Sequence, residues 1–100
     1  MTLNELMSRP DLLRLHAAMV IEDIPCKTIQ FLLLAYDLLV KWDKGCTRLE
    51  LAEAYGCSPQ AAAKHIRKLV ACGYLERVHY RAWALRETKI EQIIRTSEGG

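Results

Sequence analysis

TRLELAEAYGCSPQAAAKHIRKLVACGYLERVHYRAWALR, residues 47–86, is the stretch that decides the fold of this 100-residue chain. Thr47 and the glutamate three residues after it have the spacing of a capping box, which starts a helix. Gly56 has the freedom to take the left-handed conformation that ends a helix. Ser58 then caps a second helix, and Gly73 ends it. Two helices joined by so short a turn predict a helix-turn-helix.

Two short strands are expected directly after the second helix. The helices are predicted at Arg48–Tyr55 and Pro59–Cys72, and the strands at Tyr74–Val78 and Ala82–Arg86, with a turn near His79–Arg81. A helix-turn-helix followed by a β-hairpin has the order of a winged helix-turn-helix. Such a layout places its second helix in the major groove of DNA.

The rest of the chain is expected to be helical. Helical periodicity and proline breaks predict a short helix from Leu3, a second over Asp11–Val20, a long one over Lys27–Lys44 and a last one from Thr88 to about Arg95. The fold class is therefore mainly α with a small β-hairpin wing (α+β), a winged helix-turn-helix with additional N- and C-terminal helices. We expect one domain over residues 1–96, made of an N-terminal helical extension (1–26), a winged-helix core (27–86) and a C-terminal helix (87–96), followed by a disordered tail at 97–100.

The positive charge of the chain is concentrated in the second helix and the wing. The net charge of the whole chain is +2, but residues 64–86 carry six lysines and arginines against a single glutamate. In each of the segments 1–45, 46–63 and 87–100, acids outnumber cations. Cations gathered on one helix and the hairpin beside it are typical of a surface that holds a phosphate backbone.

The side of the second helix opposite its apolar residues is expected to face DNA. Ala62, Ile66 and Leu69 fall along one side, which is the core side. The amide of Gln60 suits adenine, and Lys64 suits guanine or a phosphate. The expected DNA-binding residues are Thr47, Arg48, Ser58, Gln60, Ala61, Lys64, His65, Arg67, Lys68, Arg77, His79 and Arg81.

Within this stretch, LAEAYGCSPQAAAKHIRKLVACGYLER resembles the winged helix-turn-helix of bacterial and phage transcription regulators, above all the MarR family. The resemblance covers residues 47 to about 88. The matching positions are Leu51, Ala52, Gly56, Cys57, Ser58, His65, Ile66, Leu69, Gly73, Tyr74 and Leu75. The resemblance implies a dimeric transcription regulator that binds palindromic operators in double-stranded DNA. It also implies that the second helix lies in the major groove and the wing on the flanking backbone.

The chain departs from the family pattern in three respects. It is shorter than the resemblance implies for a MarR-type subunit, so the long terminal helices are expected to be truncated. The wing turn His79–Arg81 is short and has no glycine, and Ala61–Ala63 stand where larger or hydroxyl residues are common. A repressor is the favoured function. Two alternatives stay open: a plasmid or phage replication or partition factor that loads on repeated DNA sites, and a winged-helix module that binds only protein.

A homodimer is expected from the apolar terminal helices. Lys27–Lys44 is apolar around more than one face, which one small domain has difficulty covering. Large exposed apolar surfaces usually mark an interface, and two-fold dimers are the commonest oligomers. The expected interface residues are Leu12, Leu15, Met19, Phe31, Leu34, Leu38, Ile90, Ile93 and Ile94. Tyr36 and Trp42 are assigned to the core or to this interface, with a small-molecule pocket as the alternative.

Other classes of function are not indicated. The four cysteines include no CxxC pair, so we expect no metal and reduced structural thiols, with redox sensing at Cys46 or Cys57 as the alternative. No catalytic constellation has recognisable spacing, so we expect neither an enzyme nor a cofactor. The N-terminus does not resemble a secretory signal, and no apolar run is long enough to span a membrane, which makes a cytoplasmic location the expectation. Nothing in the sequence supports a small-molecule effector.

Overall fold

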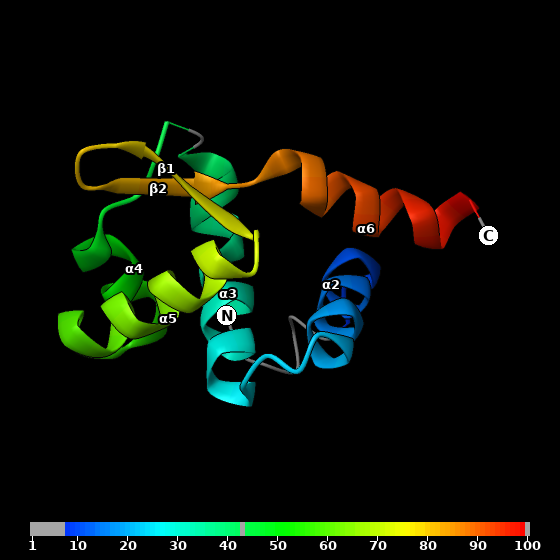
Figure 1. The fold of residues 1–100 in the computed structure, drawn as a ribbon, viewed down its shortest axis with the longest axis horizontal. Coiled ribbons are helices and arrows are strands. Elements are labelled where there is room, and N and C mark those ends of the chain that lie inside the picture. The colour runs from blue at the N-terminus through cyan, green and yellow to red at the C-terminus, as the bar shows by residue number, and fades with distance from the viewer. Residues whose placement is uncertain (1–7, 43, 100) are drawn as a thin grey trace.

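The computed structural model describes residues 8–42 and 44–99, and the helix expected from Leu3 lies outside these ranges. In chain order the elements are α2 (Pro10–Ile21), α3 (Cys26–Lys41), α4 (Arg48–Tyr55), α5 (Pro59–Ala71), β1 (Leu75–His79), β2 (Ala82–Leu85) and α6 (Glu87–Gly99). Within the described ranges there are five helices and one two-stranded antiparallel sheet, which lies along one edge of the molecule (Figure 1). This arrangement confirms the predicted fold class, a mainly helical winged helix with a β-hairpin.

Helix α3 lies at the centre of the core. Helix α2 packs on one side of it, α4 and α5 pack on another, and β2 lies beside it as well (Figure 1). Phe31, Leu32 and Leu33 of α3 have no exposed area at all. Helix α6 packs against α2, so that the terminal helices lie together at the end of the molecule away from α4 and α5 (Figure 1). A single hydrophobic cluster therefore runs from α2 through α3 to α5 and the wing.

Most residues expected at a dimer interface are core residues of the subunit instead. Leu12, Leu15, Met19 and Phe31 have no exposed area, and Ile90 is only 5% exposed. The prediction that α3 needs a second subunit to cover it is wrong, because α2 folds back over the side that α4 and α5 leave open. The partly buried remainder of the expected interface is Leu34, Leu38, Ile93 and Ile94.

The wing is attached to the loop that precedes α4. Cys46 N donates a hydrogen bond to Trp83 O (2.7 Å), and Trp83 N donates to Cys46 O (2.9 Å), so the loop extends the sheet by one bridge. Gly45 has a φ of 120°, and a Cβ at this position would lie 2.7 Å from both Ala82 Cβ and Val78 Cγ2. A glycine is needed here because any side chain would push the loop away from the hairpin.

Two helices end more than one residue away from the position that the sequence predicted. Helix α3 stops at Lys41 rather than Lys44, because the chain has to turn at Gly45 to reach the wing. Helix α6 continues to Gly99, so most of the expected disordered tail is helical; no proline interrupts this stretch. Within the described ranges, none of the helices has the length and apolar character that crossing a membrane requires.

Candidate nucleic-acid interface

The turn between α4 and α5 is fixed by caps on both helices. Thr47 Oγ1 accepts a hydrogen bond from Glu50 N (3.2 Å), and Thr47 N donates to Glu50 Oε1 (2.9 Å), which completes a capping box. Gly56 ends α4 in the left-handed conformation, with a φ of 84°. Ser58 Oγ accepts from Ala61 N (3.2 Å) and caps α5. The predicted caps are confirmed, and they fix where α5 begins and how it leaves the turn.

Helix α5 separates an apolar face from a cationic one. Its buried residues are Ala62, Ile66 and Leu69, as predicted. Because successive residues of a helix are turned by about 100°, Gln60, Lys64 and Arg67 lie on the opposite face, and all three are exposed. Lys68 is exposed at the edge of this face. The side of α5 that is free to enter a groove thus carries an amide and three cations.

His65 is turned into the protein, which corrects the expectation that it contacts DNA. Its Nδ1 lies 2.9 Å from Thr28 Oγ1, and its ring centre lies 5.1 Å from that of Phe31 and 5.8 Å from that of Tyr55. Burial lowers the pKa of the His65 imidazole, and the nearby positive charge of Lys27 lowers it further. His65 therefore joins α5 to α3 and α4 as a packing residue.

Leu49 lies on the surface of α4, unlike Leu51 and Ala52 of the same helix. It is 64% exposed, whereas those two residues of α4 are buried. A rotation of about 100° per residue places Leu49 on another side of this short helix. Its side chain instead lines a hollow beside the wing.

An arginine-rich groove lies between α5 and the wing. It has a volume of about 460 Å³, and its lining residues are Arg48, Ala63, Ile66, Arg67, Val70, Arg77 and Trp83. A neighbouring hollow of similar volume is lined by Thr47, Arg48, Leu49, Arg81 and Trp83. The two hollows share Arg48 and Trp83, so four arginines from α4, α5 and the wing surround one half-buried indole. No ion pair involves any of these four arginines in the described part of the chain.

The wing tip carries an exposed tyrosine that the sequence reasoning missed. Tyr80 is 74% exposed, and the guanidinium carbons of Arg77 and Arg81 lie 5.6 and 5.1 Å from the centre of its ring. Arg77 also donates to the carbonyl oxygens of Tyr80 and, at 3.3 Å, of His79, which holds the turn together. Aromatic rings flanked by arginines are common on surfaces that contact nucleic acids. The alternation of cations and aromatic residues over 77–83 is the sequence pattern by which Tyr80 could have been found.

The predicted DNA-binding residues fall into two neighbouring groups, apart from His65. The outer side of α5 and its cap carry Ser58, Gln60, Ala61, Lys64 and Lys68. The two hollows are lined by Thr47, Arg48, Arg67, Arg77 and Arg81, and His79 is exposed at the end of β1. Helices α4 and α5 and the turn of the wing lie at the same end of the molecule (Figure 1). The structure thus brings these two groups to one surface.

Cys46 lacks the surroundings of a redox-sensing thiol. Cys46 has no exposed area, its Sγ lies 3.7 Å from Leu38 O, and burial raises the pKa of its thiol to about 11. Because the thiolate is the reactive form, such a thiol is a poor redox sensor. In residues 8–42 and 44–99, no group of three or more histidines, cysteines or acids is placed to hold a metal ion.

The segment that forms this surface is similar to a known family. Residues 38–76 match the family described as winged helix-turn-helix DNA-binding. The matched segment runs from the last turn of α3 through α4 and α5 into β1, so it contains the predicted recognition helix. No curated protein and no solved structure matches the chain. Over residues 38–76, the chain is therefore similar to winged helix-turn-helix domains that bind DNA.

Proposed function

We propose that the chain is a sequence-specific regulator of transcription that binds double-stranded DNA and acts as a repressor. The observation that carries the proposal is the groove between α5 and the wing together with the neighbouring hollow, which are lined by Arg48, Arg67, Arg77 and Arg81. Surface cations that merely keep a protein soluble are usually interspersed with acids. Four arginines around one groove, none of them in an ion pair within the described residues, instead suit a polyanion.

In this proposal α5 lies in the major groove. Gln60 and Lys64 reach the base edges, and the alanines between them let the helix backbone approach closely. Arg67 stands between the outer face of α5 and the arginine-rich groove, where it contacts the phosphates of the strand that passes there. Tyr80 at the wing tip contacts the backbone beyond that strand.

Repression by occlusion fits the position of this surface. The DNA-contacting elements occupy one end of the molecule, while α2 and α6 lie at the other (Figure 1). A subunit bound in this way covers a promoter without needing a second surface that recruits polymerase. The proposed mode of action is therefore repression by a MarR-like regulator, the kind of protein that the sequence resembles.

A homodimer is the second part of the proposal, but with a different interface. Helix α2 exposes an apolar stripe on the side turned away from its core: Leu13 is 41%, Val20 52% and Ile21 83% exposed. Two copies of α2 that cross in antiparallel fashion bury both stripes about a two-fold axis. Such a dimer would read a palindromic operator.

Selection of bound sequences from a random duplex library tests DNA recognition. The selected duplex is then titrated with the wild-type protein, with Lys64→Ala and with Arg67→Ala, with Lys41→Ala as a control that removes an exposed cation of α3. We expect each α5 variant to lose about 1–3 kcal/mol of binding free energy, and the control to bind like wild type. A dimer that makes about six to ten phosphate contacts should lose about 10³–10⁵ in affinity between 50 and 200 mM salt.

The same experiment separates the competing functions. One palindromic site supports the regulator, whereas tandem direct repeats favour a replication or partition factor. A library that gives no enriched sequence, together with a flat salt response, would show a protein-interaction module. Sedimentation at micromolar concentration tests the dimer: a single species near 11.4 kDa would exclude it.

A further inference from the structure

One lysine of α6 joins three helices that lie far apart in the sequence. Lys89 Nζ donates a hydrogen bond to Glu22 Oε1 (2.7 Å), at the end of α2, and another to Cys72 O (2.6 Å), at the end of α5. The hydroxyl of Tyr74 donates to the same glutamate. Tyr74 has no exposed area, and it lies in the short segment that leads from α5 into β1. The link therefore connects the ends of α2 and α5 through α6.

The lysine acts on the end of α5 itself. Cys72 is the C-cap of α5, and the last carbonyls of a helix have no amide of that helix to pair with. An ammonium group is favoured at this end by the hydrogen bond and by the negative end of the helix dipole. Gly73 turns the chain here with a φ of 85°, and a Cβ on it would lie 3.5 Å from Lys89 Cδ. The stem of Lys89 thus runs along the turn by which the chain leaves α5.

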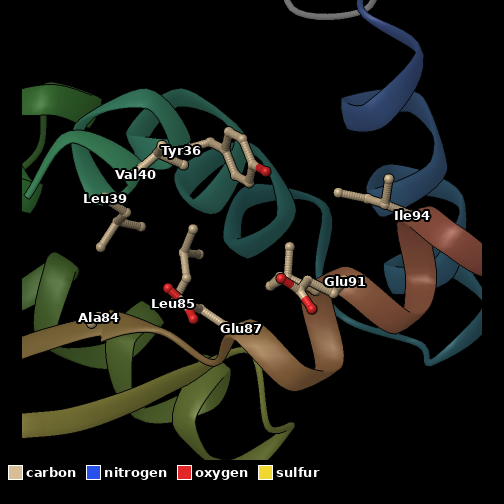
Figure 2. Close-up of a pocket in the computed structure, with 9 residues that line it drawn as sticks. Tyr36, Leu39, Val40, Ala84, Leu85, Glu87, Glu91 and Ile94 are labelled. Carbon is tan, nitrogen blue, oxygen red and sulfur yellow. The ribbon is translucent and has the colours of Figure 1, made fainter. Parts of the chain in front are cut away.

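The packing of the helices leaves a role for such a link. Helices α2 and α5 each pack on α3, and α6 packs on α2. A cleft of about 220 Å³ lies between α3 and the first turns of α6, with Tyr36 and Val40 on the α3 side and Glu87 and Glu91 on the α6 side (Figure 2). Close packing resists displacement, whereas an open space of this size leaves a helix room to tilt. Hydrogen bonds from α6 to the ends of α2 and α5 oppose such a tilt.

We propose that Lys89 is a positioning residue for DNA recognition, which fixes the direction of α5 relative to α2 and so sets the separation of the two α5 helices in the dimer. The inference rests on the proposed function, in which α2 forms the two-fold interface and α5 enters the major groove. The two recognition helices of such a dimer bind half-sites about 34–36 Å apart, or a multiple of that distance. Lys89 lies outside the proposed DNA surface, so it acts on the spacing of the half-sites and not on the bases.

Titration of palindromic duplexes that differ in the spacing of their half-sites tests this role. The probes are the duplex selected from the random library and versions with one or two base pairs added at its centre or removed from it. We expect wild type to bind the selected spacing at least about tenfold more tightly than its neighbours. In Lys89→Met this preference should fall to about threefold or less. Its affinity for a duplex with a single half-site should stay within about twofold of wild type, because the DNA contacts lie elsewhere.

A merely structural role of Lys89 would give a different result. A less stable protein loses affinity for every duplex in proportion to its unfolded fraction, and its preference among spacings stays that of wild type. Lys89→Arg keeps a cation that can bind Glu22 and Cys72 O, and it should restore the preference. Glu22→Gln keeps an acceptor for Tyr74 and should weaken the preference even if Lys89→Met does not fold. Lys41→Met removes an exposed lysine of α3 and should bind every duplex like wild type.

The wild-type protein is titrated first, and this order separates failure of the inference from failure of the proposed function. If wild type binds no duplex of the library, the proposed function has failed and the inference with it. If wild type binds as a dimer and Lys89→Met keeps the same preference among spacings, only the inference is overturned. A wild type that binds its operator as a monomer would also overturn the inference, because no second α5 would then need to be positioned.

Discussion

The end of the molecule formed by α4, α5 and the wing and the end formed by α2 and α6 differ in whether their cations form ion pairs. Around the groove between α5 and the wing, the arginines are in no ion pair with any described residue. At the end that α2 and α6 form, cations are tied to acids far away in the sequence: Arg9 binds Asp37, 28 residues later, and Lys89 binds Glu22, 67 residues earlier. The cations at the α2 and α6 end therefore stabilise the fold, whereas the arginines beside the wing are not needed for ion pairs within the described residues.

The link between the terminal helices also reaches the end of α5. Lys89 Nζ donates to Glu22 Oε1 (2.7 Å) and to Cys72 O (2.6 Å), and it lies 4.3 Å from the centre of the Tyr74 ring. The Tyr74 hydroxyl donates to the same carboxylate. Hydrogen bonds from Lys89 and Tyr74 lower the pKa of Glu22, although burial opposes them. The terminal helices are thus joined to the junction between α5 and the wing.

The largest expected effect tests whether α2 belongs to the core of the subunit. Leu15→Ala should lower the free energy of unfolding by about 2–5 kcal/mol, because it leaves a cavity at a side chain with no exposed area. Denaturant unfolding at two protein concentrations measures it. The loss should be the same at both concentrations, since Leu15 packs within one subunit.

Leu13→Ala is the matched control, because it removes the same side chain from the exposed side of the same helix. It should change the stability of the subunit little and instead weaken the proposed dimer. If Leu15→Ala shifts the dissociation of the dimer while Leu13→Ala lowers the stability of the subunit, the two faces of α2 have been assigned the wrong way round.

The next effect tests the long-range link at the terminal end. Lys89→Met keeps most of the apolar side chain but removes the ammonium group, leaving Glu22 without its cation. We expect a loss of about 1–2 kcal/mol in the free energy of unfolding, because hydrogen bonds between a charged group and partly buried partners are lost. Lys41→Met is the control: Lys41 also lies over an aromatic ring, that of Trp42, but both residues are exposed. Equal losses in the two variants would mean that the link contributes nothing to stability.

The helix-turn-helix could be predicted almost to the residue because its boundaries depend on local chemistry. A cap at Thr47, a glycine at Gly56 and a cap at Ser58 act within one helical turn of where they stand. The charge of α5 and the wing is equally visible in the sequence. What the sequence did not show is how their cations meet around Trp83, because that depends on the register of the wing against α5.

The terminal helices were predicted as helices, but their buried residues were expected to contact a second subunit, whereas they pack within the same chain. Periodicity tells that Leu12, Leu15 and Met19 share a face, but not whether that face is covered by the same chain or by another. His65 shows the same limit on a smaller scale. Its position on α5 is between the core face and the outer face, and only the rings of Phe31 and Tyr55 decide which way it turns.

A smaller effect tests the capping box at the start of α4. Thr47→Ala removes the hydroxyl of the capping box and should lower the free energy of unfolding by about 1 kcal/mol. Thr88→Ala, an exposed threonine in the first turn of α6, is the control and should have a smaller effect. Thermal unfolding of both variants measures the difference. A Thr47→Ala protein as stable as wild type would show that packing, rather than the cap, sets where α4 begins.

The smallest effect concerns the pH dependence of the free energy of unfolding to which His65 of α5 contributes. Burial holds the pKa of His65 below its ordinary value, so the unfolded chain takes up a proton before the folded one does. The stability contributed by the neutral ring is therefore present above the unfolded pKa of about 6.5 and is lost as the pH falls below it. Chemical unfolding between pH 7.5 and 5.5 should show this decline.

The variant His65→Phe tests whether His65 causes this pH dependence of stability. Phenylalanine keeps the contacts with Phe31 and Tyr55 but does not titrate, although it leaves Thr28 Oγ1 without the imidazole. Its stability should therefore start lower at pH 7.5 and decline less toward pH 5.5. His16→Gln, which alters a half-buried histidine of α2 at the other end of the molecule, should keep the wild-type slope. A slope unchanged in His65→Phe but flattened in His16→Gln would place the titrating group among the terminal helices instead of in the helix-turn-helix.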